Sequence, residues 1–244
     1  MELKKLELRL VDNYVAKAYI EKYHYSKCCG GISFALGHFY GNTLKNLIAY
    51  SIPVCRNIPQ QIMEGGTQEN TLELIRMISI DPKPKNLESY CISNTFSWIK
   101  INHPKVKIIV SYADNGMGHY GYCYQASGFT YYGQSRTTKA WFIDGKRMHE
   151  KTIFNMYGTS SYEKLKEKFG DRLICEETNE TKSRYYFILS QTKKEKKQIQ
   201  QKIKVESLPY PKGENKRYDY NDINDFSSKD SKDKIESIST FFGI

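Results

Sequence analysis

The amino-acid sequence predicts an α/β protein in which helices flank a mixed sheet, and three observations support this fold class. Between residues 72 and 144, strand-like and helix-like segments follow one another in the order β-α-β-α-β-β. The strand-like segments are short and apolar or alternating, whereas the helix-like segments repeat their apolar residues at helical spacing. Hydrophobic residues make up 39% of the 244 residues, which is enough for a packed core and excludes a fully disordered chain.

The N-terminal part of the chain predicts a helix and a hairpin. Residues 12–25 carry apolar and aromatic side chains at helical spacing behind Asp12, a residue type that caps helices. The apolar segments 32–40 and 47–54 flank a turn sequence, Gly41-Asn42. Two strands separated by such a turn predict a β-hairpin.

The central part predicts a strand, a helix and a second strand. Residues 72–80 alternate with one apolar face and stop before Pro82. Asn86 is the expected cap of a helix through residue 100, whose broad apolar surface suits packing against a sheet. Residues 106–114 form a nearly continuous apolar run, which is typical of a central strand.

A short helix is expected over 120–127, followed by strands over 129–133 and 139–144. Later in the chain, the patterns predict a helix over 160–169 and a strand over 184–190. We therefore expect three parts: a main folded domain over 1–150, a basic C-terminal extension over 151–210 packed on or beside it, and a disordered polar tail over 211–244.

The net charge of +10 suggests a polyanionic partner. Residues 1–210 hold about +11 of it, because the tail from Pro211 carries six basic and seven acidic residues. Segment 182–204 holds eight basic residues against one acidic residue. Its candidate nucleic-acid contacts are Lys193, Lys194, Lys196, Lys197 and Tyr185, since cations bind phosphates and rings stack on bases. The alternative interpretation is a solvated helix face.

Targeting and cysteine patterns predict a cytoplasmic protein. No segment approaches the ~18 consecutive apolar residues of a membrane-spanning helix, and no apolar core follows the N-terminal charges. The six cysteines form no C-x-x-C pair, which argues against a disulfide framework or a zinc ribbon.

A formal Gly116-x-Gly118-x-x-Gly121 match is a weak dinucleotide-binding signal, because no further βαβ unit and no suitably spaced acidic residue follow it.

A candidate anion site lies between the strand at 72–80 and the next helix. Arg76 lies on the apolar side of that strand and needs a partner, which is either Asp114 or an anionic ligand. Ser89 falls in the first turn of the helix behind Asn86, where free amides bind anions. Lys83 and Lys85 lie in the same loop, so the segment predicts a phosphate cradle.

Residues 111–135 carry a resemblance to known families. Tyr124-x-x-x-Gly128-Phe129, at the end of a helix before a strand, resembles the GNAT acetyltransferase superfamily. A wider set of segments, spread over roughly residues 12–145, consists of Tyr23-His24-Tyr25-Ser26, Arg76, Asn86-x-x-Ser89-Tyr90, Ser111-Tyr112-Ala113-Asp114, Gly118-His119, Tyr124-Gln125-Ala126 and Tyr132-Gly133. Together these segments resemble, more closely, the Mom family of phage DNA-modification proteins.

This resemblance implies that residues 1–150 form a GNAT-like catalytic domain with a mixed, mostly antiparallel sheet. It also implies an enzyme of phage or prophage origin that acts in the bacterial cell. The enzyme would add a carbamoylmethyl-type group to the exocyclic amine of adenine and so protect phage DNA from restriction. The implied cofactor is acetyl-CoA, and the product's nitrogen–methylene bond requires chemistry beyond acyl transfer, for which a metal such as iron is one option. The partner would be double-stranded DNA with the target adenine flipped out.

Carried over to this sequence, the resemblance assigns roles to a small set of residues. The cofactor-binding candidates are Arg76, Ser89, Lys83, Lys85 and Asn86. The catalytic candidates are Asp114, Tyr124, His24 and His119. One departure is that the loop from Asp81 to Ser89 contains none of the glycines usual in a GNAT pyrophosphate loop. Two alternatives stay open: an ordinary acetyltransferase acting on a protein, tRNA or small amine, and a non-catalytic DNA-binding protein.

Overall fold

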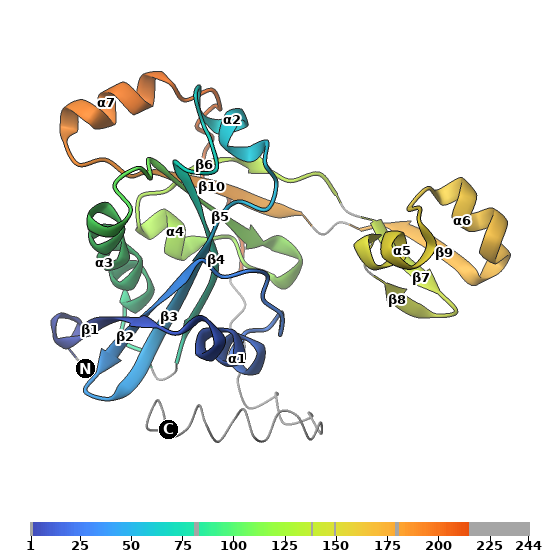
Figure 1. The fold of residues 1–244 in the computed structure, drawn as a ribbon, viewed down its shortest axis with the longest axis horizontal. Coiled ribbons are helices and arrows are strands. Elements are labelled where there is room, and N and C mark those ends of the chain that lie inside the picture. The colour runs from blue at the N-terminus through green and yellow to red at the C-terminus, as the bar shows by residue number, and fades with distance from the viewer. Residues whose placement is uncertain (1, 81–82, 138, 149, 179–180, 215–244) are drawn as a thin grey trace.

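The computed structural model describes residues 2–214, apart from 81–82, 138, 149 and 179–180 (Figure 1). Its main feature is a seven-stranded sheet in the order β1-β2-β3-β4-β5-β10-β6. Strands β4 and β5 run parallel, and every other neighbouring pair in this sheet is antiparallel. The structure therefore confirms the predicted α/β class with a mixed, mostly antiparallel sheet.

The elements of this main body have the following bounds. The strands are β1 (Glu7–Val11), β2 (Phe34–Tyr40), β3 (Thr43–Ser51), β4 (Thr71–Ser79), β5 (Ile108–Asp114), β6 (Thr130–Gln134) and β10 (Lys182–Ile188). The α-helices are α1 (Asn13–Tyr23), α2 (Ile58–Ile62), α3 (Leu87–Asn102), α4 (Tyr122–Ala126) and α7 (Lys193–Gln201). Two short 3-10 turns are η1 (Leu3–Lys5) and η2 (Asn115–Met117).

The two expected helix caps have different outcomes. Asp12 caps α1 as predicted, because its carboxylate accepts hydrogen bonds from the amides of Tyr14 (2.8 Å) and Val15 (3.3 Å). Asn86 precedes α3 but makes no side-chain cap; its backbone is left-handed, with φ of +66°. Asparagine tolerates that conformation better than most residues, so Asn86 serves the sharp turn into α3 and not the capping bond.

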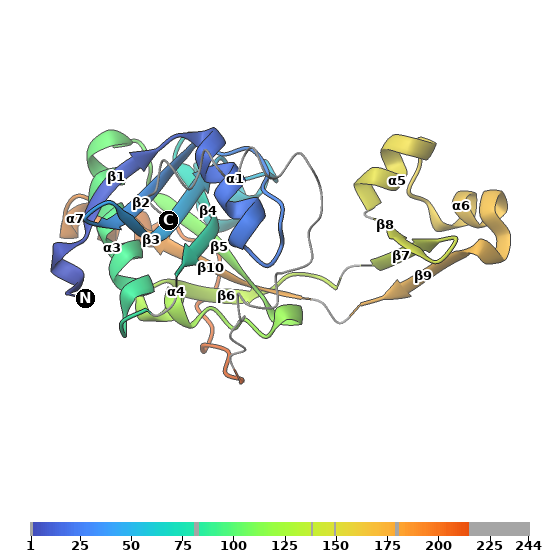
Figure 2. The same ribbon diagram turned by 90° about the horizontal axis from the view of Figure 1, so that it is seen from below.

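Alternating residues divide the sheet into two covered faces. Leu36 and Ile48 belong to the cluster that packs against α3, whereas Ala35 and Leu47 belong to the cluster that packs against α1. Figures 1 and 2 show α3 and α1 on opposite sides of the strands. A third cluster, at the end of the sheet marked by Ile188, joins β5, β6 and β10 to α2 and α7.

A second unit is inserted between β6 and β10. It contains β7 (Lys139–Ile143), β8 (Lys146–Met148), β9 (Leu173–Glu177), α5 (Glu150–Tyr157), α6 (Tyr162–Phe169) and η3 (Gly170–Arg172). Its three strands form their own sheet in the order β8-β7-β9, and both ribbon views show the unit as a separate body (Figures 1 and 2). Its core is small: Trp141, Ile143, Ile153, Leu165 and Leu173.

The structure divides the chain differently from the expected boundary at residue 150. The strand expected over 139–144 forms, but in the inserted sheet. The expected extension over 151–210 includes β10, which lies inside the main sheet between β5 and β6. The chain therefore consists of a main body and an insertion. It leaves the main sheet after β6, forms the inserted unit, and returns to the main sheet as β10, the strand next to β6.

Residues 211–214, which we assigned to the tail, pack against α4. Gln125 donates a hydrogen bond to the carbonyl of Pro211 (3.2 Å), and the Tyr122 hydroxyl donates to the carbonyl of Gly213 (2.7 Å). The rest of the expected tail, residues 215–244, lies outside the described residues. Across the part of the chain that the structure describes, no helix combines the length and the apolar character needed to cross a membrane.

Candidate functional site

The candidate site lies where β4 and β5 separate. These parallel strands pair only over Thr71–Leu74 and Ile108–Ser111, although β4 continues to Ser79 and β5 to Asp114. The Ser111 hydroxyl donates to the Leu74 carbonyl (3.0 Å) at the last paired position. Beyond it the facing edges of these two strands no longer pair with one another, so backbone groups there can bind a ligand, although the carbonyls of Ile75 and Asp114 already accept hydrogen bonds from Arg76 and His119.

Three aromatic rings from two loops meet at this end of the sheet. His24 follows α1, and its ring centroid lies 4.3 Å from that of Tyr25. Tyr25 in turn lies 5.2 Å from His119, which comes from the loop after β5. That loop folds back because the amide of His119 donates to the carbonyl of Asp114 (3.0 Å). The predicted candidates His24, His119 and Asp114 are thereby brought together.

His24 is held neutral. Burial lowers its pKa from 6.5 to about 3, with further contributions from the charges of Arg76 and His119. Its Nδ1 accepts a hydrogen bond from the amide of Ser26 (3.1 Å), which places the proton of the neutral ring on Nε2. The side chain can therefore donate a hydrogen bond from Nε2 at neutral pH, but it carries no positive charge there.

Arg76 ties the loop after α1 to β4. Its Nε donates to the carbonyl of Cys28 (3.1 Å), and one terminal nitrogen donates to the carbonyl of Ile75 (2.6 Å). The expected alternative, an ion pair with Asp114, does not form, and Arg76 has no ion pair among the described residues. The guanidinium keeps its charge available to an anion at the open end of β4 and β5.

Tyr124 lies under this end of the sheet, on α4. Its side chain is buried, and burial raises its pKa well above 10, with Cys123 adding to the shift and a polar contact with Ser111 opposing it. The phenol is therefore protonated at neutral pH and can act as a donor. Asp114 is half-buried, and its charge counteracts the lowered pKa of His119, so the two groups are electrostatic neighbours.

In the expected phosphate cradle, Lys83 and Ser89 already have protein partners, which the sequence did not predict. Lys83 forms an ion pair with Glu88 (2.6 Å), in the first turn of α3. The Ser89 hydroxyl donates to the Asn86 carbonyl (3.2 Å) and still has free lone pairs. Lys85 is exposed. Among the described residues no hydrogen bond is found for the amides of Glu88 and Ser89, so the helix start can accept an anion that displaces Glu88 from Lys83.

The basic helix α7 lies at the other end of the sheet. β10 runs antiparallel to β5, with Lys182 opposite Asp114 and Ile188 opposite Ile108, so the end of β10 that leads to α7 lies about 20 Å along the strand from Asp114. The four candidate lysines of α7 are exposed: Lys193, Lys194, Lys196 and Lys197. They form a surface that is separate from the cluster around Tyr25.

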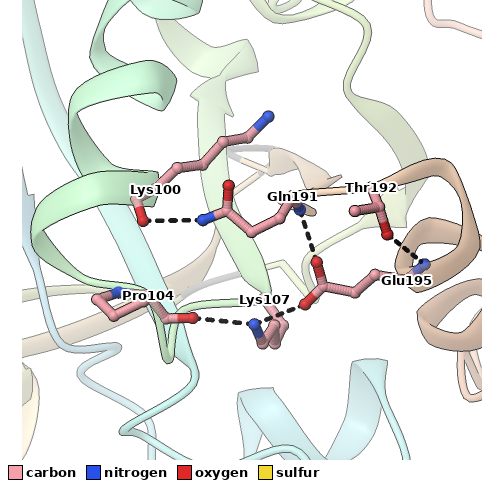
Figure 3. Close-up of polar contacts among 6 residues, drawn as sticks. All are labelled: Lys100, Pro104, Lys107, Gln191, Thr192 and Glu195. Carbon is pink, nitrogen blue, oxygen red and sulfur yellow. Dashed lines mark hydrogen bonds and ion pairs between the residues drawn. The ribbon is translucent and has the colours of Figure 1, made fainter.

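A polar network fixes α7 to the main body (Figure 3). Glu195 accepts a hydrogen bond from Lys107 (2.7 Å), and Lys107 also donates to the carbonyl of Pro104 (2.9 Å). Gln191 donates through its side chain to the carbonyl of Lys100 (2.9 Å) and through its amide to Glu195 (2.6 Å). These contacts leave the lysine face of the helix outward.

The assignment of Tyr185 to nucleic-acid contact is wrong. Its side chain is fully buried, and its hydroxyl donates to the carbonyl of Tyr120 (2.6 Å). The ring packs between Tyr124 and Tyr131 in the core that also contacts α3. Alternate residues of a strand point to opposite faces, and both faces of β10 are covered: Tyr185 packs on the α3 side and Tyr186 on the α2 side.

Sequence reasoning missed three residues of this site. Tyr25 connects the two histidines, Glu88 neutralises Lys83, and Ser111 contacts Tyr124. Tyr25 and Ser111 belong to motifs of the family resemblance, and Glu88 is an acid in the first turn of a predicted helix, where acids are favoured. Only the packing shows that they act together.

No group of three or more His, Cys, Asp or Glu side chains suited to a metal occurs among the described residues.

Several solved acetyltransferase structures have a similar chain path. They include the ribosomal-protein-S5-alanine acetyltransferase from Vibrio fischeri, with a TM-score of 0.43, 9% identity and coverage of 78% of this chain and 97% of that chain. Another is spermidine N-acetyltransferase from Vibrio cholerae, in complex with CoA and spermine, with a TM-score of 0.41, 9% identity and coverage of 76% and 96%.

Similarity in sequence extends over most of the chain. Over 211 residues the chain is 28% identical to the methylcarbamoylase Mom of Escherichia phage Mu, and the match covers 86% of this chain and 85% of that protein. The model of the Mom protein family matches residues 5–212, a span that includes the whole main sheet, the inserted unit and part of the segment packed on α4. The chain therefore belongs to the Mom protein family.

Proposed function

We propose that this protein is a transferase that adds a carbamoylmethyl-type group to the exocyclic amine of adenine in double-stranded phage DNA. The observation that supports it most is the meeting of residues from separate segments around Tyr25: His24, His119, Asp114, Arg76 and Tyr124. These are the residues that the family resemblance marks, and they gather where β4 and β5 stop pairing.

Acetyl-CoA is the proposed cofactor. The separated edges of β4 and β5 offer backbone groups to an extended chain such as pantetheine, and the first turn of α3 offers amides to a pyrophosphate. Ser89 and Lys85 would contact the phosphates, and Lys83 would exchange Glu88 for them. Arg76 would add a positive charge from β4. When bound, the cofactor supplies a two-carbon group activated as a thioester.

The protein residues supply positioning and proton transfer. Asp114, at the end of β5, is the proposed acceptor of a proton from the adenine amine, and Tyr124 is the proposed donor to the leaving sulfur. Neutral His24 donates a hydrogen bond through Nε2. Joining the amine to the methyl carbon of an acetyl group and amidating its carbonyl also requires an ammonia equivalent and a two-electron oxidant. Among the described residues no group of three or more His, Cys, Asp or Glu side chains could hold a metal ion, so no step is assigned to iron.

DNA modification is the direct test of this function. The protein is expressed in bacterial cells together with its phage partners, and nucleosides from the cellular DNA are analysed by mass spectrometry. We expect a new deoxyadenosine carrying the mass of a carbamoylmethyl group. Unmodified adenine in every preparation would overturn the proposal. Acetylation of protein, tRNA or small amines without DNA would then support the ordinary acetyltransferase alternative.

A non-catalytic DNA-binding role is tested by the same assay with Arg76→Ala. A catalytic role predicts loss of the modified nucleoside while DNA binding persists. A binding role predicts that Arg76→Ala binds DNA as the unaltered protein does and that neither preparation changes adenine. Circular dichroism shows whether the variant is folded, which matters because Arg76 also holds the Cys28 loop.

A further inference from the structure

A second polar cluster lies on the sheet face opposite α3 and α4, beside the candidate site. It consists of Glu73 on β4, Tyr112 on β5, Arg184 on β10 and Tyr132 on β6. Tyr112 and Tyr132 pack with the cluster on the α2 side, whereas their chain neighbours point into the core under α3. Tyr112 and Arg184 are cross-strand partners, and the charges of Glu73 and Arg184 both act on Tyr112.

Two hydrogen-bond donors of this cluster are buried without a partner among the described residues. Within that part of the chain neither the Tyr112 hydroxyl nor Arg184 Nε has a hydrogen bond, although other atoms of both residues are partly accessible. The Tyr132 hydroxyl lies near the Tyr112 hydroxyl, and each tyrosine influences the pKa of the other. A buried donor without an acceptor costs free energy, so such groups usually have a ligand. Two unsatisfied donors at one place therefore indicate a binding site for a molecule with acceptor atoms.

The cluster also contains one acceptor and one stacked cation. The pKa of Glu73 is raised by burial, and the amide of Val54 and the charges of Lys182 and Arg76 oppose this shift. The Arg184 guanidinium lies over the Tyr132 ring, with its carbon 4.8 Å from the ring centroid. A phosphate group would meet a carboxylate at this place, which disfavours it. A neutral heterocycle with both acceptor and donor atoms matches two donors, one acceptor and the adjoining tyrosine ring.

The position of the cluster links it to the reacting centre. Tyr112 and Asp114 lie two residues apart on β5, so their side chains leave the sheet on the same face. Lys182, opposite Asp114, adds a positive charge at the edge. A base bound at Tyr112 would therefore have one edge close to Asp114.

We propose that Glu73, Tyr112 and Arg184 form the subsite for the extruded base and recognise an amino-substituted heterocycle such as adenine. Tyr112 and Arg184 donate to ring nitrogens, Glu73 accepts from an exocyclic N–H, and Tyr132 supports the guanidinium. This inference rests on the proposed function. The three subsite residues are additional to those that gather around Tyr25.

The loop between β3 and α2 supports an approach of duplex DNA from this side. The amide of Val54 faces Glu73, and the Val54 side chain is 85% exposed. Ile52, two residues earlier, is 49% exposed. Apolar side chains on such a loop can enter the stack where a base has left it, as wedges do in other DNA-binding proteins.

The test compares the binding of two oligonucleotides. One is a short oligodeoxythymidylate with a single central adenine, and the other carries an abasic position there. We expect the unaltered protein to prefer the adenine probe. Tyr112→Phe and Glu73→Met should each reduce that preference by about tenfold, because each substitution removes one hydrogen-bonding group that faces the base but roughly keeps the size of the side chain. Tyr131→Phe is the matched control, since Tyr131 points to the other face of β6.

Each outcome has a definite meaning for the subsite. Equal weakening with both probes would overturn the inference, since it would show that the cluster contacts the backbone. An unchanged adenine preference in both folded variants would also overturn it. The modification assay separates these failures from a failure of the proposed function. If the unaltered protein modifies adenine and both variants modify it equally, only the subsite is wrong; if the unaltered protein never modifies adenine, the function itself fails.

Discussion

At the scale of single residues, the local environment of Tyr124 keeps its proton in place. The hydroxyl is buried under the separating ends of β4 and β5, and burial raises the pKa well above 10. The ring contacts Phe129 and Tyr185, with centroids 5.3 and 5.6 Å away, so it also contributes to the core. To separate the hydroxyl's role as a donor from the ring's role in packing, a substitution has to remove only one of the two.

Tyr124→Phe is that substitution. It preserves the ring and its packing but removes the donor hydroxyl. We expect the yield of modified deoxyadenosine to fall by about a hundredfold or more, the typical contribution of a positioned acid. Nucleoside mass spectrometry measures the yield, and a melting curve measures the fold.

Asp114→Ala should abolish modification in the same assay while DNA binding persists, because the variant lacks the proposed acceptor of the amine proton. If Tyr124→Phe retains full modification, the tyrosine serves packing alone, and Asp114 has to be judged by its own variant.

His24 makes a prediction about pH. Its pKa is about 3 in the folded protein and about 6.5 in the unfolded chain, so below pH 6.5 the unfolded chain binds the extra proton first. Stability contributed by neutral His24 is therefore complete above pH 6.5 and decreases as the pH falls towards 3. We expect the melting temperature to decrease over this range.

His38, whose pKa burial lowers to about 4, acts in the same direction. His24→Asn should make the melting temperature less dependent on pH between 6.5 and 4. An identical pH dependence in this variant would show that His24 is solvated in solution.

At the scale of elements, α7 is a cationic surface distant from the candidate site. The helix is attached by a partly buried ion pair between Lys107 and Glu195. The hydrogen bond that Lys107 donates lowers the pKa of the Glu195 carboxyl. The helix is short, and Ile199 is its buried residue among those described. The polar network in Figure 3 therefore carries much of its attachment.

Removing the charge of Glu195 tests that attachment. Glu195→Gln should lower the free energy of unfolding by about 1 kcal/mol, because the variant no longer forms a hydrogen-bonded charge pair at a partly buried position. Chemical denaturation measures the change, and Glu206→Gln is the exposed control. Equal stabilities of the two variants would show that the apolar packing of Ile199 holds α7 alone.

The lysines of α7 make a prediction about salt. Replacing Lys193, Lys194, Lys196 and Lys197 by Gln should make the slope of log affinity against log salt shallower, by about 0.9 for each phosphate that the helix no longer neutralises. Binding titrations at several salt concentrations measure this slope. A comparison set on the inserted unit is Lys139, Lys146, Lys164 and Lys168. If only this second set changes the slope, the DNA lies against the insertion and the α7 face is merely solvated.

At the scale of the whole molecule, the inserted unit joins two neighbouring strands. The amide of Ser135 donates to the carbonyl of Lys182 (2.8 Å), so the chain leaves and re-enters the main sheet at almost one point. The unit has its own small sheet and core. Such an insertion can be removed without breaking a strand pair of the main sheet.

Replacing residues 136–180 by a short glycine-rich linker should therefore leave a folded main body. We expect one cooperative melting transition within a few degrees of that of the full chain, measured by circular dichroism. An unfolded product would show that the insertion stabilises β6 and β10.

The sequence predicted local elements well where one pattern dominated. The Asp12 cap, the turn at Gly41, the strand before Pro82 and the apolar run ending at Asp114 all have their expected structure. It did not predict β1, where Leu8 and Leu10 alternate with charged residues over only five positions. Such a short edge strand forms because β2 offers it hydrogen bonds, which is a property of the assembled sheet.

The sequence by itself determined the fold class and the family motifs, because each of these depends on spacing along one segment, and the family resemblance marked most of the residues that gather around Tyr25. Only the tertiary structure decided that β10 lies between β5 and β6, that Tyr185 is core, and that Glu73, Tyr112 and Arg184 meet on one face. These facts depend on pairing between strands about 70 residues apart, such as Tyr112 with Arg184, and no local pattern encodes such a pairing.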